Sequence, residues 1–179
     1  MKSKLDINPP HDKLCRGIKL IFGLGNPGKD YANTYHNAGD LFVKFLEEKS
    51  GEDFPIALIQ ASKSGLFMNE IGKEVIKQTK YLKTKPIEIL VAHDDVDIAL
   101  GKYKLSFAKS SAGHKGVESI IKHLKTENFW RLRIGIAKKD ARDKKIKAEK
   151  FVLKKISKED LSKIEKAFEE ALKEISSSL

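Results

Sequence analysis

Short apolar runs alternate with amphipathic segments along this chain, and that alternation limits the folds it can adopt more than any other feature. Apolar runs of strand length occur at 18–24, 56–61, 87–92, 103–107 and 130–136. Between and after them, apolar residues recur at helical spacing. Such interleaving is typical of an α/β fold. The run at 103–107 lies close in sequence to its predecessor, so we predict a single-domain mixed β-sheet flanked by helices.

Each expected helix has a recognisable stripe or boundary. The stripe of the first helix is Leu41, Phe42, Phe45 and Leu46, and that of the second is Ile71, Val75, Thr79 and Leu82. A third helix is expected after His114, to about Leu124. The stripe of the last helix is Leu161, Ile164, Phe168, Leu172 and Ile175. Gly51 is placed to stop the first helix, and Asn69 to cap the second. Ser157, with Asp160 three residues on, is placed to begin the last. The acidic segment 93–97 is expected to be a loop, and 130–136 a half-buried strand.

Length and composition indicate one domain. At 179 residues and 40% hydrophobic content, the chain can bury one core. Its apolar runs are far shorter than the ~20 residues that span a bilayer, so we expect a soluble protein. Residues 1–16 carry prolines and mixed charge without periodicity and are predicted to form a flexible leader before the domain at 17–179. A lysine-rich, mobile linker is expected at 137–149.

The charge balance favours a polyanionic partner. Thirty-five Lys and Arg against 25 Asp and Glu give a net charge of +10, which points to nucleic acid first and an anionic membrane surface second. The single cysteine, Cys15, excludes an internal disulfide framework and fits a reducing compartment. The histidines show no CxxC or HExxH spacing, so no metal site is predicted. The N-terminus has no apolar secretory segment, and a cytoplasmic location is expected.

A glycine-rich segment, Gly23-Leu24-Gly25-Asn26-Pro27-Gly28, follows the first strand and fits the GxGxxG pattern of dinucleotide-binding folds. In those folds the third glycine lies in a helix that packs on the sheet. Here residues 29–34 are polar and have no apolar stripe. The motif therefore favours a tight turn over a nicotinamide or flavin site.

Polar side chains gather where sheet strands end. Asn26 lies between the glycines, His36 follows ten residues later, and Asn69 begins a helix. Asp94 lies just past a buried strand. Open α/β folds build their sites from such loops, so these four side chains are expected to converge.

Six spaced motifs together resemble the bacterial-type peptidyl-tRNA hydrolases. In the family's order they are the glycine-rich segment followed by Tyr31, Thr34-Tyr35-His36-Asn37-Ala38-Gly39, Phe67-Met68-Asn69, His93-Asp94-Asp95-Val96-Asp97, Gly113-His114-Lys115-Gly116, and 129–136. The likeness runs from about Ile18 to the final helix. It implies a monomeric enzyme, without cofactor or metal, that hydrolyses the ester between peptide and tRNA in peptidyl-tRNA and so recycles tRNA from aborted translation. The implied partner is tRNA, and no membrane is involved.

The resemblance also implies roles for single residues. His36 would be the general base that activates water, and Asp94 would bond its other ring nitrogen, fix its tautomer and stabilise the imidazolium. The residues expected to contact the substrate are Asn26, Tyr31, Met68, Asn69, His114 and Lys115. The residues expected to bind tRNA phosphates are Arg133, Lys104 and Lys109, and binding should weaken as salt rises.

Several of these roles have alternatives. Asp95 or Asp97 could supply the carboxylate instead of Asp94. Asn69 could be only a helix cap, and His114 could be a buried, hydrogen-bonded loop residue. His93 and His123 are not expected to be catalytic.

Two departures from the family pattern bear on activity. Lys115 stands where the family usually has a substrate-holding asparagine, and a lysine cannot accept a hydrogen bond as a carboxamide can. Ser106 stands where the family tends to carry a phosphate-binding lysine, for which Lys104 and Lys109 are possible substitutes. The alternative function is therefore a catalytically weak or inactive hydrolase-like protein that binds RNA. The presence of all four convergent polar residues favours the enzyme.

Overall fold

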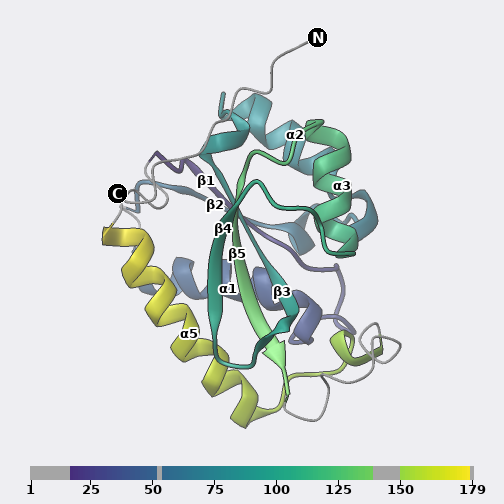
Figure 1. Cartoon of the computed structure of the whole chain (residues 1–179), viewed down its shortest axis with the longest axis vertical. Coiled ribbons are helices and arrows are strands. Elements are labelled where there is room, and N and C mark those ends of the chain that lie inside the picture. The colour runs from purple at the N-terminus through teal and green to yellow at the C-terminus, as the bar shows by residue number, and fades with distance from the viewer. Residues whose placement is uncertain (1–16, 52–53, 139–149, 178–179) are drawn as a thin grey trace.

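Five strands form one mixed sheet at the centre of the computed structural model, which describes residues 17–51, 54–138 and 150–177 (Figure 1). In chain order they are β1 (Leu20–Gly23), β2 (Ala57–Gln60), β3 (Ile89–Ala99), β4 (Tyr103–Phe107) and β5 (Trp130–Ala137). Their order across the sheet is β2-β1-β3-β5-β4. β4 runs antiparallel to β5 and the other neighbours are parallel, which confirms the mixed sheet. The leader predicted at 1–16 and residues 139–149 of the linker predicted at 137–149 lie outside the described residues, and the linker prediction is wrong at Ala137, which is the last residue of β5.

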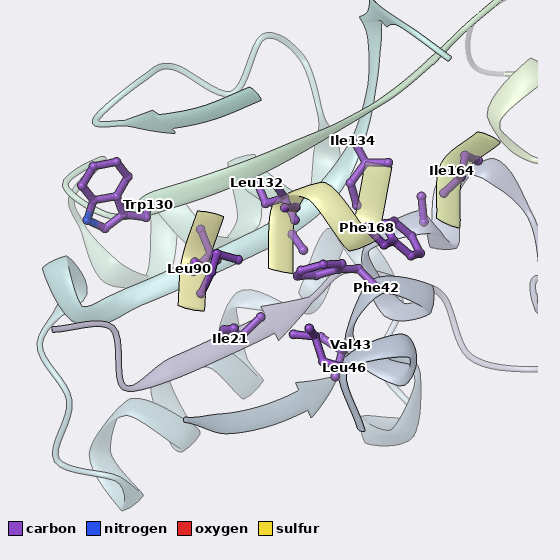
Figure 2. Close-up of a cluster of buried hydrophobic side chains, with 14 of the residues drawn as sticks. Ile21, Phe42, Val43, Leu46, Leu90, Trp130, Leu132, Ile134, Ile164 and Phe168 are labelled. Atoms are coloured by element: carbon purple, nitrogen blue, oxygen red, sulfur yellow. The ribbon is translucent and has the colours of Figure 1, made fainter. Parts of the chain in front are cut away.

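Helices cover both faces of the sheet. α1 (Ala38–Lys49) and α5 (Lys158–Ser177) pack on one face, and α2 (Gly72–Tyr81) and α3 (Lys115–Leu124) on the other (Figure 1). In the first layer Leu90 and Leu132 of the sheet lie in one core cluster with Phe42 and Phe168, whose ring centroids are 5.2 Å apart (Figure 2). Within the described part of the chain, no helix has the length and apolar character needed to cross a bilayer.

The start of α1 is held close to the ends of β1 and β3. A Cβ on Gly39 would clash with the carbonyl oxygen of Ala92 and would lie 2.6 Å from the main-chain nitrogen of Leu24, so only glycine permits this approach. The N–H of Asp40 donates to Leu24 O at 3.0 Å. This packing fixes the direction in which the chain enters α1, and therefore the place of the residues just before it.

The expected acidic loop at 93–97 is wrong, because these residues belong to β3. β3 extends beyond Ala92, where its pairing with β1 ends, since β5 continues alongside it as far as Gly135. A register shift lies between Asp95 and Ala99. Asp94 therefore sits on a paired strand, which holds its side chain more firmly than a loop would.

Two further expectations are also corrected. The strand 130–136 is not half-buried: β5 is an interior strand covered on both faces, and Arg131 is only 2% exposed. Asn69 does not cap α2, which begins three residues later after Ile71; Asn69 lies in a separate 3-10 turn at Met68–Glu70. Both differences arise from tertiary packing that local spacing does not reveal.

Candidate active site

The candidate site forms at the carboxyl end of β1, next to the middle of β3. Asn26 and His36 follow β1, and Asp94 lies on β3 just beyond the part that pairs with β1. Met68 and His114 reach the same place from the 3-10 turn before α2 and from the N-terminus of α3. Ligand sites of open α/β sheets occupy this kind of crevice.

Asp94 joins two imidazoles. Its Oδ1 lies 2.8 Å from His36 Nδ1 and 3.0 Å from His114 Nε2, and its side chain is almost fully buried. An ionised carboxylate only accepts hydrogen bonds, so both of these ring nitrogens carry protons. The neutral form of His36 therefore has a bare Nε2, which is the arrangement a general base requires.

His114 is satisfied at both ring nitrogens. Its Nδ1 accepts a hydrogen bond from the N–H of Val117 at 3.4 Å, so the residue caps α3 while its Nε2 binds Asp94. Both predictions for His114 therefore describe it: it lies at the site, and it is a hydrogen-bonded residue next to a loop. Its ring centroid lies 5.0 Å from that of His36.

The electrostatic setting favours an imidazolium at His36. Burial lowers the pKa of His36, but the charge of Asp94 and the hydrogen bond to it raise that pKa above its ordinary value of 6.5, while the charge of Lys115 opposes the rise. Burial likewise raises the pKa of Asp94, but the charges and hydrogen bonds of His36 and His114 outweigh it and hold that pKa well below its usual range. Asp94 therefore stays ionised while His36 titrates.

His93 is the neighbour of Asp94 but faces a different environment. Its Nδ1 lies 2.7 Å from the main-chain oxygen of Asp94, and its Nε2 has no hydrogen-bond partner among the described residues. Burial, supported by the charge of His114, lowers the pKa of His93 to about 3. The ring is therefore neutral at physiological pH.

Asn26 is held by a network that fixes its amide orientation. Its Oδ1 accepts from the N–H of Met68 at 2.9 Å. Its main chain exchanges two hydrogen bonds with the side chain of Asn37, at 2.9 and 3.0 Å. Because the oxygen of the Asn26 amide is engaged, the amide nitrogen is the group that remains for a ligand.

The acidic residues that follow Asp94 do not face His36. Asp95 Oδ2 accepts from Arg133 Nε at 2.7 Å, and Asp95 Oδ1 accepts from the N–H of Asp97 at 2.9 Å. Asp97 itself is exposed. Of the three candidate carboxylates, only Asp94 contacts the base.

The remaining expected contact residues differ in packing and exposure. Tyr31 packs edge-to-face on Phe67, with ring centroids 5.9 Å apart. Asn69 and Lys115 are exposed, and Met68 is buried. Lys115 is the first residue of α3, directly after His114.

The expected phosphate-binding residues lie on or next to β4, the edge strand, and on its neighbour β5. Lys104 of β4 and Arg133 of β5 are directly opposite each other in the antiparallel pair, so their side chains share one face. Lys109 is exposed and follows β4. Ser106 is opposite Arg131 and its hydroxyl has no hydrogen-bond partner among the described residues.

The glycine-rich segment does not have dinucleotide-binding geometry. Gly28 has φ +97°, and the first α-helix begins only at Ala38. A Cβ on Gly25 would lie 2.6 Å from the side-chain carbon Cγ of Asp40, so that glycine serves packing. With no helix N-terminus after the third glycine, the feature that binds pyrophosphate in those folds is missing here.

His36, Asp94 and His114 are also the group of described residues that could hold a metal ion. One ligand atom from each lies within 4.8 Å of the others. A metal would need the two ring nitrogens unprotonated, whereas here both donate to Asp94. Metal binding and the described hydrogen bonds are therefore alternatives at this site.

Sequence reasoning did not predict two interactions at the site, those of Asn37 with Asn26 and of Asp95 with Arg133. Asn37 lies beside His36 in a quoted motif, but its bonds to Asn26 join positions eleven apart through a loop, which no periodicity reveals. The pairing of Asp95 with Arg133 spans 38 positions. The parallel register of β3 and β5, which sets His93 beside Arg133, is the feature that would have indicated this proximity.

Comparisons with known proteins agree on one family. The family model described as Peptidyl-tRNA hydrolase matches residues 20–179. The chain is 34% identical over 171 residues to a peptidyl-tRNA hydrolase of Desulfitobacterium hafniense, covering 88% of this chain and 91% of that protein. It is 37% identical over 170 residues to that of Aquifex aeolicus, covering 87% of each.

Solved structures show the same similarity in three dimensions. The crystal structure of peptidyl-tRNA hydrolase from Acinetobacter baumannii superposes with a TM-score of 0.75 at 31% sequence identity. The match covers 89% of this chain and 87% of the other. The sheet, both helical layers and the site therefore fall within a shared fold.

Proposed function

We propose that this chain, which belongs to the peptidyl-tRNA hydrolase family, cleaves its substrate with a water molecule that His36 activates. The enzyme hydrolyses the ester bond between peptide and tRNA in peptidyl-tRNA, and so returns tRNA from aborted translation. The observation that carries the proposed mechanism is the 2.8 Å contact between His36 Nδ1 and Asp94 Oδ1.

The proton follows a short path in this mechanism. His36 Nε2 takes a proton from water as the water oxygen attacks the ester carbonyl carbon. Asp94 stabilises the imidazolium that results. When the tetrahedral intermediate collapses, the bond from carbonyl carbon to ribose oxygen breaks and His36 returns the proton to that oxygen. The products are the peptide acid and tRNA with a free ribose hydroxyl.

Asn26 is proposed to donate to the carbonyl oxygen as it becomes an oxyanion. Its amide oxygen accepts from the N–H of Met68, which leaves the NH₂ group as the donor for a ligand. A neutral donor suits this role because it does not perturb the charge of the base. Loss of one such donor typically costs ~100-fold in rate or more.

Peptide and ribose contacts are proposed for the residues that border this pair: Tyr31, Met68, Asn69, His114 and Lys115. Lys115 is exposed and close enough to His36 to oppose its protonation. A cation in that place suits a phosphate or RNA backbone better than a peptide N–H.

The tRNA is proposed to contact the three cations Lys104, Lys109 and Arg133 of β4, the segment after it, and β5. The cross-strand pairing of Lys104 with Arg133 supports this, since two cations on one face attract a phosphate. Arg133 Nε is engaged by Asp95, which orients the guanidinium and leaves its terminal nitrogens as donors. We further propose a monomer, because one chain supplies every residue to which the proposed mechanism gives a role. The proposed place of action is the cytoplasm, and no cofactor takes part in the proposed steps.

The test is to incubate the protein with N-acetylated aminoacyl-tRNA and with free aminoacyl-tRNA. Release of amino acid from the blocked substrate alone, lost in His36→Ala while tRNA binding persists, is the expected result. Binding of tRNA with no release from either substrate would contradict the mechanism and favour a protein that only binds RNA.

A further inference from the structure

We propose that Lys155 and Asp160 are positioning residues for His36, held in a clamp segment (151–160) that fixes the base loop (29–36). The inference rests on the proposed role of His36 and extends it to residues that act through the loop. The contacts recorded for Lys155 and Asp160 are with residues other than His36 and Asp94.

The base loop has little regular structure of its own. Its internal hydrogen bonds are turn bonds, such as Tyr31 N–H to Gly28 O at 3.2 Å and Thr34 N–H to Tyr31 O at 3.1 Å. Asn33 has φ +58°, an uncommon conformation for a residue other than glycine. His36 follows in a single 3-10 turn at Tyr35–Asn37. A loop of this kind needs contacts from outside to keep one side chain in place.

Lys155 supplies the first of these contacts. Its Nζ donates to the carbonyl oxygens of Lys29, at 2.9 Å, and Ala32, at 2.6 Å. The ammonium thus satisfies two carbonyls that the irregular turn leaves without partners in a helix or strand. This bridging fixes the path of the loop between Gly28 and the base.

Main-chain pairing supplies the second contact. Thr34 and Lys155 form an antiparallel bridge. Around it lie two further hydrogen bonds, Tyr35 N–H to Lys154 O at 3.2 Å and Ile156 N–H to Asn33 O at 2.8 Å. The clamp segment therefore holds the base loop like a short edge strand, up to the residue before His36.

Asp160 supplies the third contact, through Tyr35. The Tyr35 hydroxyl donates to Asp160 Oδ2, and Lys138 Nζ pairs with the same oxygen. The Tyr35 ring stacks on Phe151 with centroids 4.6 Å apart. Tyr35 and Asp160 are 2% and 4% exposed, so their hydrogen bond is shielded from water, whereas the side chain of Lys138 reaches Asp160 from the surface.

The placement of Tyr35 and His36 links the clamp to catalysis. They are neighbours in one turn, with Tyr35 bound to the clamp segment and His36 bound to Asp94. If Tyr35 shifts, the direction of the His36 ring shifts with it. Since a displacement of ~1 Å at a reacting group can cost ~100-fold in rate, the clamp bears directly on the chemical step.

Single-turnover cleavage of N-acetylated aminoacyl-tRNA tests this inference. In Lys155→Met and Asp160→Asn the rate at saturating enzyme should fall about 10- to 100-fold, while the half-saturating enzyme concentration changes less than about twofold. Lys155→Arg keeps a donor for both carbonyls and should recover most of the rate. A purely structural role would lower thermal stability without this split and without recovery by arginine. Lys158→Met, an exposed lysine at the start of α5, is the matched control and should behave as the parent.

Tyr35→Phe keeps the ring stacking and removes only the hydroxyl, so it decides the matter if Asp160→Asn does not fold. A folded Lys155→Met or Tyr35→Phe protein with the parental cleavage rate would overturn the clamp. His36→Ala in the same assay separates the two ideas: parental rates there would contradict the proposed mechanism, whereas an inactive His36→Ala with parental clamp variants would remove the clamp alone.

Discussion

His36 and His93 both contact Asp94, through its side chain and its main chain respectively, and their pKa values shift in opposite directions. His36 binds the side chain of Asp94, and that charge raises its pKa above 6.5 in spite of burial. His93 binds only the main-chain oxygen of Asp94, and burial lowers its pKa to about 3. The charge of Asp94 raises the pKa of both rings, but only at His36, which bonds the carboxylate itself, does this effect outweigh burial.

Replacing each imidazole in turn is expected to give the largest difference. His36→Ala should lower single-turnover cleavage of N-acetylated aminoacyl-tRNA by about 10³- to 10⁵-fold, because it removes the group proposed to take the proton from water. His93→Asn keeps a donor for the main-chain oxygen and should retain activity within about fivefold. Comparable losses in the two variants would contradict the claim that His36, and not His93, is the base.

Removing the charge of Asp94 should remove the feature that separates His36 from His93. Asp94→Asn is expected to reduce cleavage by about 10²- to 10⁴-fold, because His36 loses both its orientation and the partner of its imidazolium. Asp94 raises the pKa of His36, so the acid limb of the residual pH–rate profile should move to lower pH. An acid limb at the parental pH would mean that another group sets the titration.

A more modest change is expected from the cation beside the base. Lys115 lowers the pKa of His36, so in Lys115→Asn the acid limb should move to higher pH. Above that limb the asparagine can accept a peptide N–H, and the rate should rise about two- to fivefold. A pH–rate profile decides both points; an unchanged or reduced rate at pH 8 would count against a limit set by peptide holding.

Burial also shifts the pKa of a second carboxylate, that of Asp40 at the start of α1. Burial raises the pKa of Asp40 to about 6, opposed by hydrogen bonds from Ser62 and by other, weaker interactions. Because the folded pKa exceeds the unfolded value of 3.8, the cost of ionised Asp40 is full above pH 6 and is relieved as pH falls toward 3.8. Asp40→Asn should raise the free energy of unfolding at pH 8 by about 1–3 kcal/mol and change it less at pH 4. Urea titrations at both values measure this; destabilisation at pH 8 would contradict it.

Chelation is expected to have no effect on the rate. A metal bound by His36, Asp94 and His114 would replace the hydrogen bonds that Asp94 accepts from the two rings. The proposed mechanism needs those hydrogen bonds, so it predicts parental cleavage after dialysis against EDTA. Loss of activity that returns with added Zn²⁺ would favour metal chemistry instead.

Most of the fold can be predicted from the sequence, because strands and helices leave local periodicities in it. The apolar stripe of the last helix is buried at Ile164, Phe168 and Ile175, and Ser157 Oγ accepts from the N–H of Asp160 at 3.2 Å. The acidic segment was misjudged because polarity suggested a loop, whereas pairing with β5 makes it a strand.

The site was foreseeable only in part. The convergence of Asn26, His36 and Asp94 followed from their places after strands, but the choice of Asp94 over Asp95 came from family resemblance. The structure supplies the physical reason, since Asp95 binds Arg133. Contacts such as Tyr35 with Asp160, 125 positions apart, leave no local signal in the sequence.

The most direct test is an NMR titration of the His36 ring in protein with ¹⁵N-labelled histidine, using His36→Gln to assign the signals. We expect the neutral ring to carry its proton on Nδ1 and to titrate above pH 6.5, and we expect Asp94→Asn to lower that midpoint. A neutral ring protonated on Nε2, or a midpoint below 6.5 in the parent protein, would contradict the assignment of His36 as the base steadied by Asp94.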